Sequence, residues 1–115
     1  MRFENLIVWQ KSKDLCVDIY KHFNELKDFG FRDQITRSSL SIVSNIAEGF
    51  ERESNKELIR FLYIAKGSCG ELRWQLIIAK EISFIDQETA EKLINQAKEI
   101  SYMLNSLIQT RKNFQ

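Results

Sequence analysis

The fold of this chain is decided by residues 54–79, which read SNKELIRFLYIAKGSCGELRWQLIIA. Ser54 and Glu57 fit a capping box, in which the serine hydroxyl accepts a hydrogen bond from the amide of Glu57 and the glutamate side chain reaches back. Apolar or small residues then alternate at spacings of four and three: Leu58, Leu62, Ala65, Cys69, Leu72, Leu76 and Ala79. This spacing places one continuous stripe along a helix, as in a bundle seam. The stretch therefore predicts a long helix over about residues 55–83.

Three further segments with helical periodicity accompany this one, over about residues 8–26, 31–50 and 87–112. We expect Gly30 to stop the first of them and Asp86 to cap the last. The chain contains no proline, the residue that most often breaks a helix. No stretch alternates between turn signals as a half-buried strand would. The sequence therefore predicts an all-α protein, an antiparallel up-down four-helix bundle forming a single domain over residues 1–115.

Composition excludes several classes of protein. The chain has 115 residues, of which 43% are hydrophobic and 29% charged, as in ordinary soluble domains. Its 17 basic and 16 acidic residues give a net charge of +1, which does not mark a general polyanion binder. The apolar run over residues 6–9 is too short for a signal peptide or a membrane span. We therefore expect a cytoplasmic protein without a membrane partner, in which Cys16 and Cys69 are buried thiols rather than a disulfide.

Residues for metal binding or catalysis are scarce. A metal site needs a cluster of ligands, but the chain has one histidine and two widely separated cysteines. Ile19 precedes His22 by three positions, so the Glu-x-x-His motif of di-iron bundles is missing. His22 would have to serve alone as a catalytic base, and no glycine-rich phosphate loop is present. We expect no metal, no cofactor and no enzymatic activity; an enzyme would have to depend on His22.

The long helix carries a second stripe beside its seam, at spacings of four, three, four and three. This stripe consists of Tyr63, Gly67, Gly70, Trp74 and Ile77. Each glycine inside a helix costs about 0.8–1 kcal/mol relative to alanine, a loss that close approach of another backbone would offset. The stripe predicts a homo-oligomer interface, because large apolar patches are rare on monomers. The alternative is a monomer in which this helix is central and loops cover its ends. The pattern does not fix the number of copies.

A polar group near the end of the second segment predicts a structural network of Asn45, Glu48 and Arg60. Asn45 and Glu48 are three residues apart and share a helix face. Arg60 lies in the first turns of the next helix, which must start close by after a short turn. Glu48 is expected to pair with Arg60 or with Arg52 and so to fix the turn.

Basic residues recur every seven positions along the long helix, at Lys66, Arg73 and Lys80. Such a row could track the phosphates of a nucleic acid, and the symmetry of an oligomer would multiply it. Arg37, Arg52 and Arg60 are second candidates for this role. The alternative is a solvated flank whose basic side chains pair with acidic residues of a neighbouring helix.

Several stretches of the sequence together resemble a known family. They are residues 3–10 (FENLIVWQ), 34–42 (QITRSSLSI), 44–49 (SNIAEG) and 60–68 (RFLYIAKGS). They resemble the bacterial four-helix-bundle proteins encoded within intervening sequences of 23S ribosomal RNA genes. The resemblance implies a ring of identical subunits, typically a homopentamer. It extends to the accessory variability protein of diversity-generating retroelements, a basic pentameric barrel that binds nucleic acid and works with a reverse transcriptase.

These observations support two functions from different classes. The first is a non-enzymatic oligomeric helical bundle that binds RNA or DNA, or a nucleic-acid-processing partner, through a cationic surface. The second is a structural oligomer or protein-interaction scaffold with no role in nucleic-acid binding. Salt-sensitive binding of RNA separates the two, because contacts to phosphates weaken steeply as salt rises.

Overall fold

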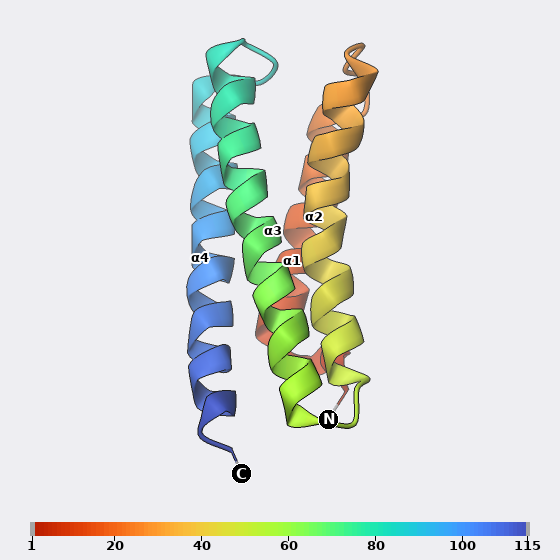
Figure 1. The fold of residues 1–115 in the computed structure, drawn as a ribbon. Helices are drawn as coiled ribbons and strands as arrows, with labels where there is room; N and C mark the ends of the chain where they lie inside the picture. The colour runs from red at the N-terminus through yellow and green to blue at the C-terminus, as the bar shows by residue number, and fades with distance from the viewer. Residues whose placement is uncertain (1, 115) are drawn as a thin grey trace.

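The computed structural model describes residues 2–114 and contains four α-helices, preceded by a 3₁₀ turn, η1, over Phe3–Asn5 (Figure 1). The helices are α1 (Ile7–Phe23), α2 (Phe29–Phe50), α3 (Asn55–Glu81) and α4 (Gln87–Lys112). Residues 2–114 contain no strand, and the bundle measures 48 × 21 × 20 Å. The prediction of an all-α protein with four helices is confirmed.

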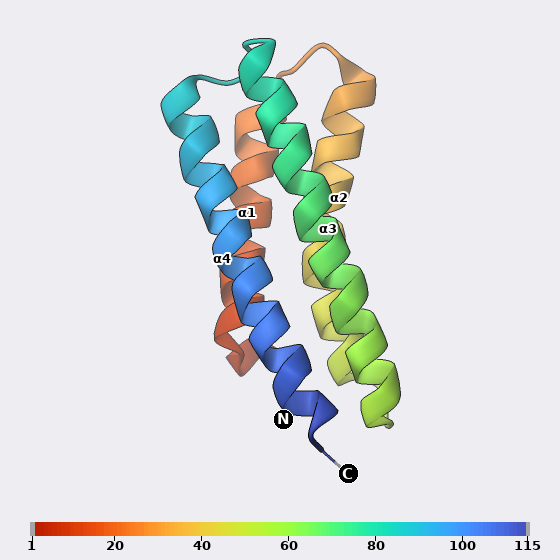
Figure 2. The same ribbon diagram turned by 60° about the vertical axis from the view of Figure 1, so that its left-hand side comes forward.

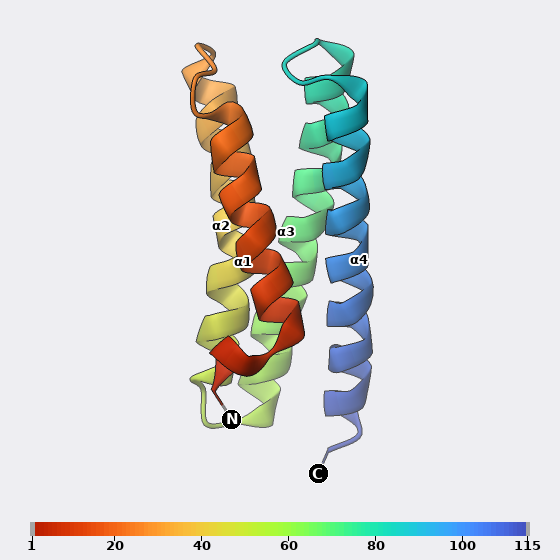
Figure 3. The ribbon, with the colours of Figure 1, turned by 180° about the vertical axis from the view of Figure 1, so that it is seen from behind.

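The helices run up and down in chain order, and α4 returns to lie beside α1 (Figure 3). The α1–α2 and α3–α4 connections lie at one end, and the α2–α3 turn lies at the other with η1 and the last turn of α4 (Figures 1 and 2). α3 lies between α2 and α4 and makes the most extensive contacts with both. One side of α3 therefore faces the core, while the opposite side is covered by no other helix (Figure 1).

The core forms along the predicted seam of α3, whose seven members are all buried: Leu58, Leu62, Ala65, Cys69, Leu72, Leu76 and Ala79. Large side chains of the other helices complete it, among them Phe23, Ile42 and Leu104. The spacing of four and three works here because it keeps one face of the helix turned inward over its whole length. Cys16 and Cys69 are free buried thiols, as predicted.

Polar side chains cap the helices. The Ser54 hydroxyl accepts a hydrogen bond from the Glu57 amide at 3.1 Å, and the Asp86 carboxylate accepts one from the Thr89 amide at 2.8 Å. Both caps were predicted. These bonds satisfy amides that lack a partner within the helix, which fixes where α3 and α4 begin.

The boundary between α1 and α2 differs from the prediction. Gly30 does not stop a helix but lies inside the first turn of α2, which begins at Phe29. The physical reason is Asp28, whose carboxylate accepts a hydrogen bond from the Phe31 amide at 3.0 Å and so starts the helix earlier. α1 correspondingly ends at Phe23 rather than near residue 26.

The close packing of α2 on α3 sets how α3 is rotated in the bundle. A Cβ atom on Gly49 would lie 3.0 Å from the Cβ of Phe61, so the two backbones approach closely there. Further along, the hydroxyls of Ser41 and Ser68 are hydrogen bonded at 2.8 Å. These contacts hold one flank of α3 against α2 and leave the other flank, which carries Lys66 and Arg73, toward α4.

Candidate nucleic-acid interface

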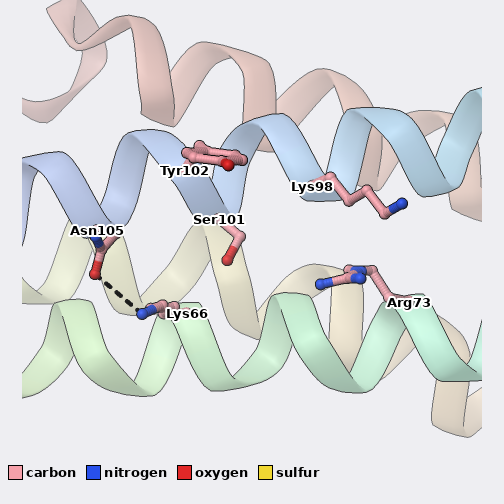
Figure 4. Close-up of a pocket in the computed structure, with 6 residues that line it drawn as sticks. All are labelled: Lys66, Arg73, Lys98, Ser101, Tyr102 and Asn105. Atoms are coloured by element: carbon pink, nitrogen blue, oxygen red, sulfur yellow. Dashed lines mark hydrogen bonds between the residues drawn. The ribbon is translucent and has the colours of Figure 1, made fainter.

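A groove of about 450 Å³ between α3 and α4 brings together three basic side chains. α3 contributes Lys66 and Arg73, and α4 contributes Lys98. The remaining lining residues are Ser101, Tyr102 and Asn105, so no acidic side chain lines the groove (Figure 4). Such a site is suited to an anion, because each basic group raises the local positive potential.

The groove has a regular register, since seven residues separate both Lys66 from Arg73 and Lys98 from Asn105. At one level the Lys66 ammonium donates a hydrogen bond to Asn105 Oδ1 at 3.0 Å. At the next level Arg73 and Lys98 both lie in the space between the two helices, one from each (Figure 4). Side chains seven residues apart lie on nearly the same side of a helix, so the two helices form one continuous channel.

The basic side chains of the groove form no ion pair with any acidic residue of the described chain. The alternative expectation, that Lys66 and Arg73 pair with acidic residues of a neighbouring helix, therefore does not hold here. In addition, Nε of Arg73 is buried and has no hydrogen-bond acceptor among residues 2–114. A buried donor without a partner costs about 1–3 kcal/mol.

Basic residues continue from the groove along α4 toward the end of the bundle, and we call Lys98, Asn105 and Lys112 the α4 stripe. Lys112 lies one heptad beyond Asn105, and its ammonium is 5.2 Å from the ring centroid of Tyr63. From Lys98 to Lys112 the α4 stripe extends about 21 Å along the helix, at 1.5 Å per residue. Sequence reasoning missed both lysines, although their common spacing of seven with Asn105 was a readable signal.

The other predicted basic residues lie outside this groove. Lys80 lines a separate depression at the α3–α4 turn, where Glu81 and Asp86 also lie. Arg37 is exposed on α2, next to Tyr20 and Leu40.

The remaining two candidates, Arg52 and Arg60, both stack on one aromatic ring near the α2–α3 turn. Their guanidinium carbons are 4.9 and 5.6 Å from the ring centroid of Phe61. Of the three basic residues predicted on α3, Lys66 and Arg73 therefore line the groove and Lys80 does not. The third basic residue of the groove is Lys98 of α4.

The predicted polar network of Asn45, Glu48 and Arg60 does not form. Glu48 pairs with Arg52, one turn further along the chain, which was the second of the two expected partners. The Asn45 amide donates to the backbone oxygen of Ser41 at 2.8 Å. Arg52 follows Glu48 by four residues, just beyond the end of α2, so its guanidinium reaches the Glu48 carboxylate.

The predicted interface residues share the uncovered side of α3. Tyr63, Trp74 and Ile77 are 43%, 51% and 45% exposed, and Gly67 and Gly70 are exposed between them. A Cβ atom on either glycine would meet nothing within 4 Å. Packing within the chain thus gives no reason for glycine at these two positions, in contrast to Gly49.

The residues considered for metal binding or catalysis are dispersed in the structure. Residues 2–114 hold no group of three or more His, Cys, Asp or Glu side chains that could bind a metal ion. His22 is exposed near the end of α1. Hydrogen bonds from Thr89 are the main cause of the lowered pKa of Asp86. None of the helices in residues 2–114 has the length and apolar composition needed to cross a membrane.

Comparison with known proteins places the chain in a family. No curated protein matches it. A crystal structure of a protein of unknown function from the S23 ribosomal protein family of Bacteroides thetaiotaomicron is 34% identical. The match covers 89% of this chain and 98% of that chain, with a TM-score of 0.84. The family model of the 23S rRNA-intervening sequence protein matches residues 4–106, which include α1, α2, α3 and most of α4. The chain therefore belongs to the 23S rRNA-intervening sequence protein family.

Proposed function

We propose that this protein is a non-enzymatic, self-associating helical bundle that binds RNA or DNA through the groove between α3 and α4. The observation that carries the proposal is the convergence of Lys66, Arg73 and Lys98 in one channel without an acidic neighbour. A chain with a net charge of only +1 concentrates positive charge at this place. The phosphate backbone of a nucleic acid supplies the matching row of negative charges.

The donors in the groove suit phosphate oxygens. The guanidinium of Arg73 presents a planar fork of N–H groups that can bind a phosphate at two oxygens. The Nε of Arg73 is buried, so contacts to a phosphate in the groove would come from the terminal N–H groups of the guanidinium. Lys66 donates one hydrogen bond to Asn105 and has two further donors for an anion. Lys98 adds a third positive charge from the opposite helix.

Self-association is supported by the uncovered face of α3. Its exposed apolar side chains include Tyr63, Trp74 and Ile77, and Ile64 and Ile78 border them. Gly67 and Gly70 leave this face flat enough for another backbone to approach closely. Burying such a patch against a second copy removes apolar surface from water, which is favourable by about 25 cal/mol for each Å².

A second set of exposed apolar side chains, on α1 and α2, favours a ring over a simple dimer. Val17 and Tyr20 of α1 and Leu40 of α2 are all exposed. Contact between two unlike patches is head-to-tail, and copies joined in this way close into a ring when the rotation allows it. We propose a homopentamer, the copy number that the family resemblance implies. A ring repeats the groove, and linked sites bind a long strand with higher avidity than one site.

The proposal is tested by fluorescence anisotropy with a labelled single-stranded RNA of mixed sequence, over a series of salt concentrations. The wild-type protein should bind at low salt and lose affinity steeply as salt rises. Lys66→Glu, Arg73→Glu and Lys98→Glu together should reduce affinity at least tenfold. Lys92→Glu is the matched control, because Lys92 is exposed on α4 but lies about 120° around the helix from Lys98. Absence of binding at low salt, or equal loss in the control, contradicts the proposal.

The scaffold function is retained as a second candidate because of the same α3 face. It predicts that light scattering shows an oligomer while the RNA titration shows no binding at any salt concentration. A monomeric mass of 13.6 kDa across all protein concentrations would contradict self-association in both candidates.

A further inference from the structure

We propose that the groove between α3 and α4 accepts an unpaired nucleotide, whose base stacks on Tyr102 while its phosphate lies between Arg73 and Lys98. The inference rests on the proposed function and adds the class of nucleic acid: single-stranded rather than duplex. Two features of the groove carry it, namely an exposed aromatic ring and a pair of basic side chains, one from each helix, in the same groove.

Tyr102 is the most exposed large hydrophobic side chain of residues 2–114, because 79% of it is exposed. Among the described residues its ring takes part in no aromatic pair and no cation–π contact. In this it differs from Tyr63, which has Lys112 over its ring. Little in the described chain therefore covers the ring, and its aromatic surface remains available to a ligand.

The position of Tyr102 relates it to the basic residues of the groove. It follows Lys98 by four residues, so the two side chains are neighbours on the surface of α4. Arg73 lies across the groove from Lys98 (Figure 4). A base stacked on the tyrosine ring would bring its own phosphate into the channel between these two cations.

The remaining lining residues and the size of the groove fit one nucleotide. Ser101 lines the floor with a hydroxyl that can donate or accept a hydrogen bond. Asn105 beside it keeps its amide donors free, since its oxygen accepts from Lys66. The groove volume of about 450 Å³ lies within the range of about 300–1,000 Å³ that small ligands occupy.

The preference for single strands follows from the stacking contact. Bases inside a duplex are stacked on one another, so a protein ring cannot reach their faces without unpairing them. Basic side chains alone attract phosphates of single and double strands alike. Stacking on an aromatic ring is sequence-tolerant and adds affinity only for an unpaired base. Tyr102 is thus the residue through which the groove would distinguish single-stranded from double-stranded nucleic acid.

The test compares one labelled 20-nucleotide RNA, single-stranded and annealed to its complement, on the wild-type protein and three variants. The wild type should bind the single strand at least tenfold more tightly than the duplex. Tyr102→Ala should weaken single-strand binding about tenfold and leave duplex binding unchanged. Tyr102→Phe should retain the preference, because the ring and its stacking surface remain. Phe29→Ala is the matched control, an exposed aromatic residue at the start of α2 whose removal should change neither affinity.

The possible results separate the two claims. If Tyr102→Ala binds the single strand as tightly as the wild type, or if the wild type binds both forms equally, this inference is wrong while the groove stands as a phosphate-binding site. If the wild type binds neither form, the proposed function itself is wrong. Circular dichroism checks that each variant keeps its helices, as expected for substitutions at exposed positions.

Discussion

Lys66 on α3 and Asn105 on α4 are joined by a hydrogen bond of 3.0 Å from the ammonium to the amide oxygen. The bond links the two helices inside the groove while leaving the positive charge of the lysine uncompensated. A negative charge introduced at position 105 should therefore affect ligand binding much more than it affects the packing of α3 on α4.

Asn105→Asp places a carboxylate where the amide now lies, so that Lys66 gains an ion pair. We expect the affinity for single-stranded RNA at low salt to fall about tenfold, because one cation of the groove is neutralised and one negative charge is added. The free energy of unfolding should change by no more than about 1 kcal/mol. RNA titration and urea denaturation measure the two effects. Asn95→Asp, the same change at an exposed position of α4, is the control and should leave affinity within a factor of two.

The double variant Gly67→Ala, Gly70→Ala should change protomer stability and association in opposite directions. Neither new methyl group meets an atom of its own chain, so each should raise the free energy of unfolding of the protomer by about 0.8–1 kcal/mol. The same methyl groups would hold a neighbouring helix away and weaken assembly. Urea denaturation at dilute concentration and light scattering at high concentration measure the two quantities. An unchanged oligomer mass would show that this face of α3 is not the interface between copies.

Gly49→Ala should have the opposite effect on stability. Its added Cβ would lie 3.0 Å from the Cβ of Phe61 and 3.1 Å from Cδ1 of Leu58. Overpacking of this kind costs about 1–3 kcal/mol, which exceeds the gain in helix propensity. We expect a net loss of about 1 kcal/mol in the free energy of unfolding, measured by urea denaturation. A stabilised variant would mean that α2 and α3 can separate there without loss of other contacts.

Burial of Cys69 predicts that stability falls at high pH. Burial raises the pKa of this thiol from 9.0 to about 12. Between these values the unfolded chain has lost the proton and the folded chain retains it, so the free energy of unfolding decreases as pH rises. The slope contributed by this group is up to about 1.4 kcal/mol per pH unit.

Urea denaturation of the wild type and of Cys69→Ala at pH 8 and pH 10.5 measures this effect. Both proteins share their lysines and tyrosines, so the difference between their pH dependences reports on residue 69. The variant should lose less stability over this interval than the wild type. Parallel pH profiles would contradict the raised pKa.

The helices and their caps could be predicted because their determinants are local. The spacing of Leu58, Leu62 and Ala65 fixes a helix face, and Ser54 and Asp86 begin helices through bonds to amides three residues away. The boundary at Gly30 was wrong because two local signals compete there. The glycine is a common helix stop, but the Asp28 carboxylate caps the helix that contains it.

The groove could be predicted only in part because it depends on how two helices face each other. The spacing of Lys66 and Arg73 shows that they share a flank of α3. It does not show which residue of α4 lies opposite them, which is why Lys98 was missed. Lys80 has the same spacing, but α3 ends one residue later, at Glu81, and that end faces the turn instead of the groove. Register between helices is a property of the packed bundle and not of either segment.

The three like charges in the groove have a practical consequence for anyone handling this protein. Without a ligand they repel one another, so small polyvalent ions of the buffer will gather between α3 and α4 and relieve that repulsion. Phosphate or sulfate should therefore raise the melting temperature more than chloride at equal ionic strength, since a species that binds only the native state stabilises it. Thermal data on this protein are comparable only when the buffer anion is held as constant as the pH.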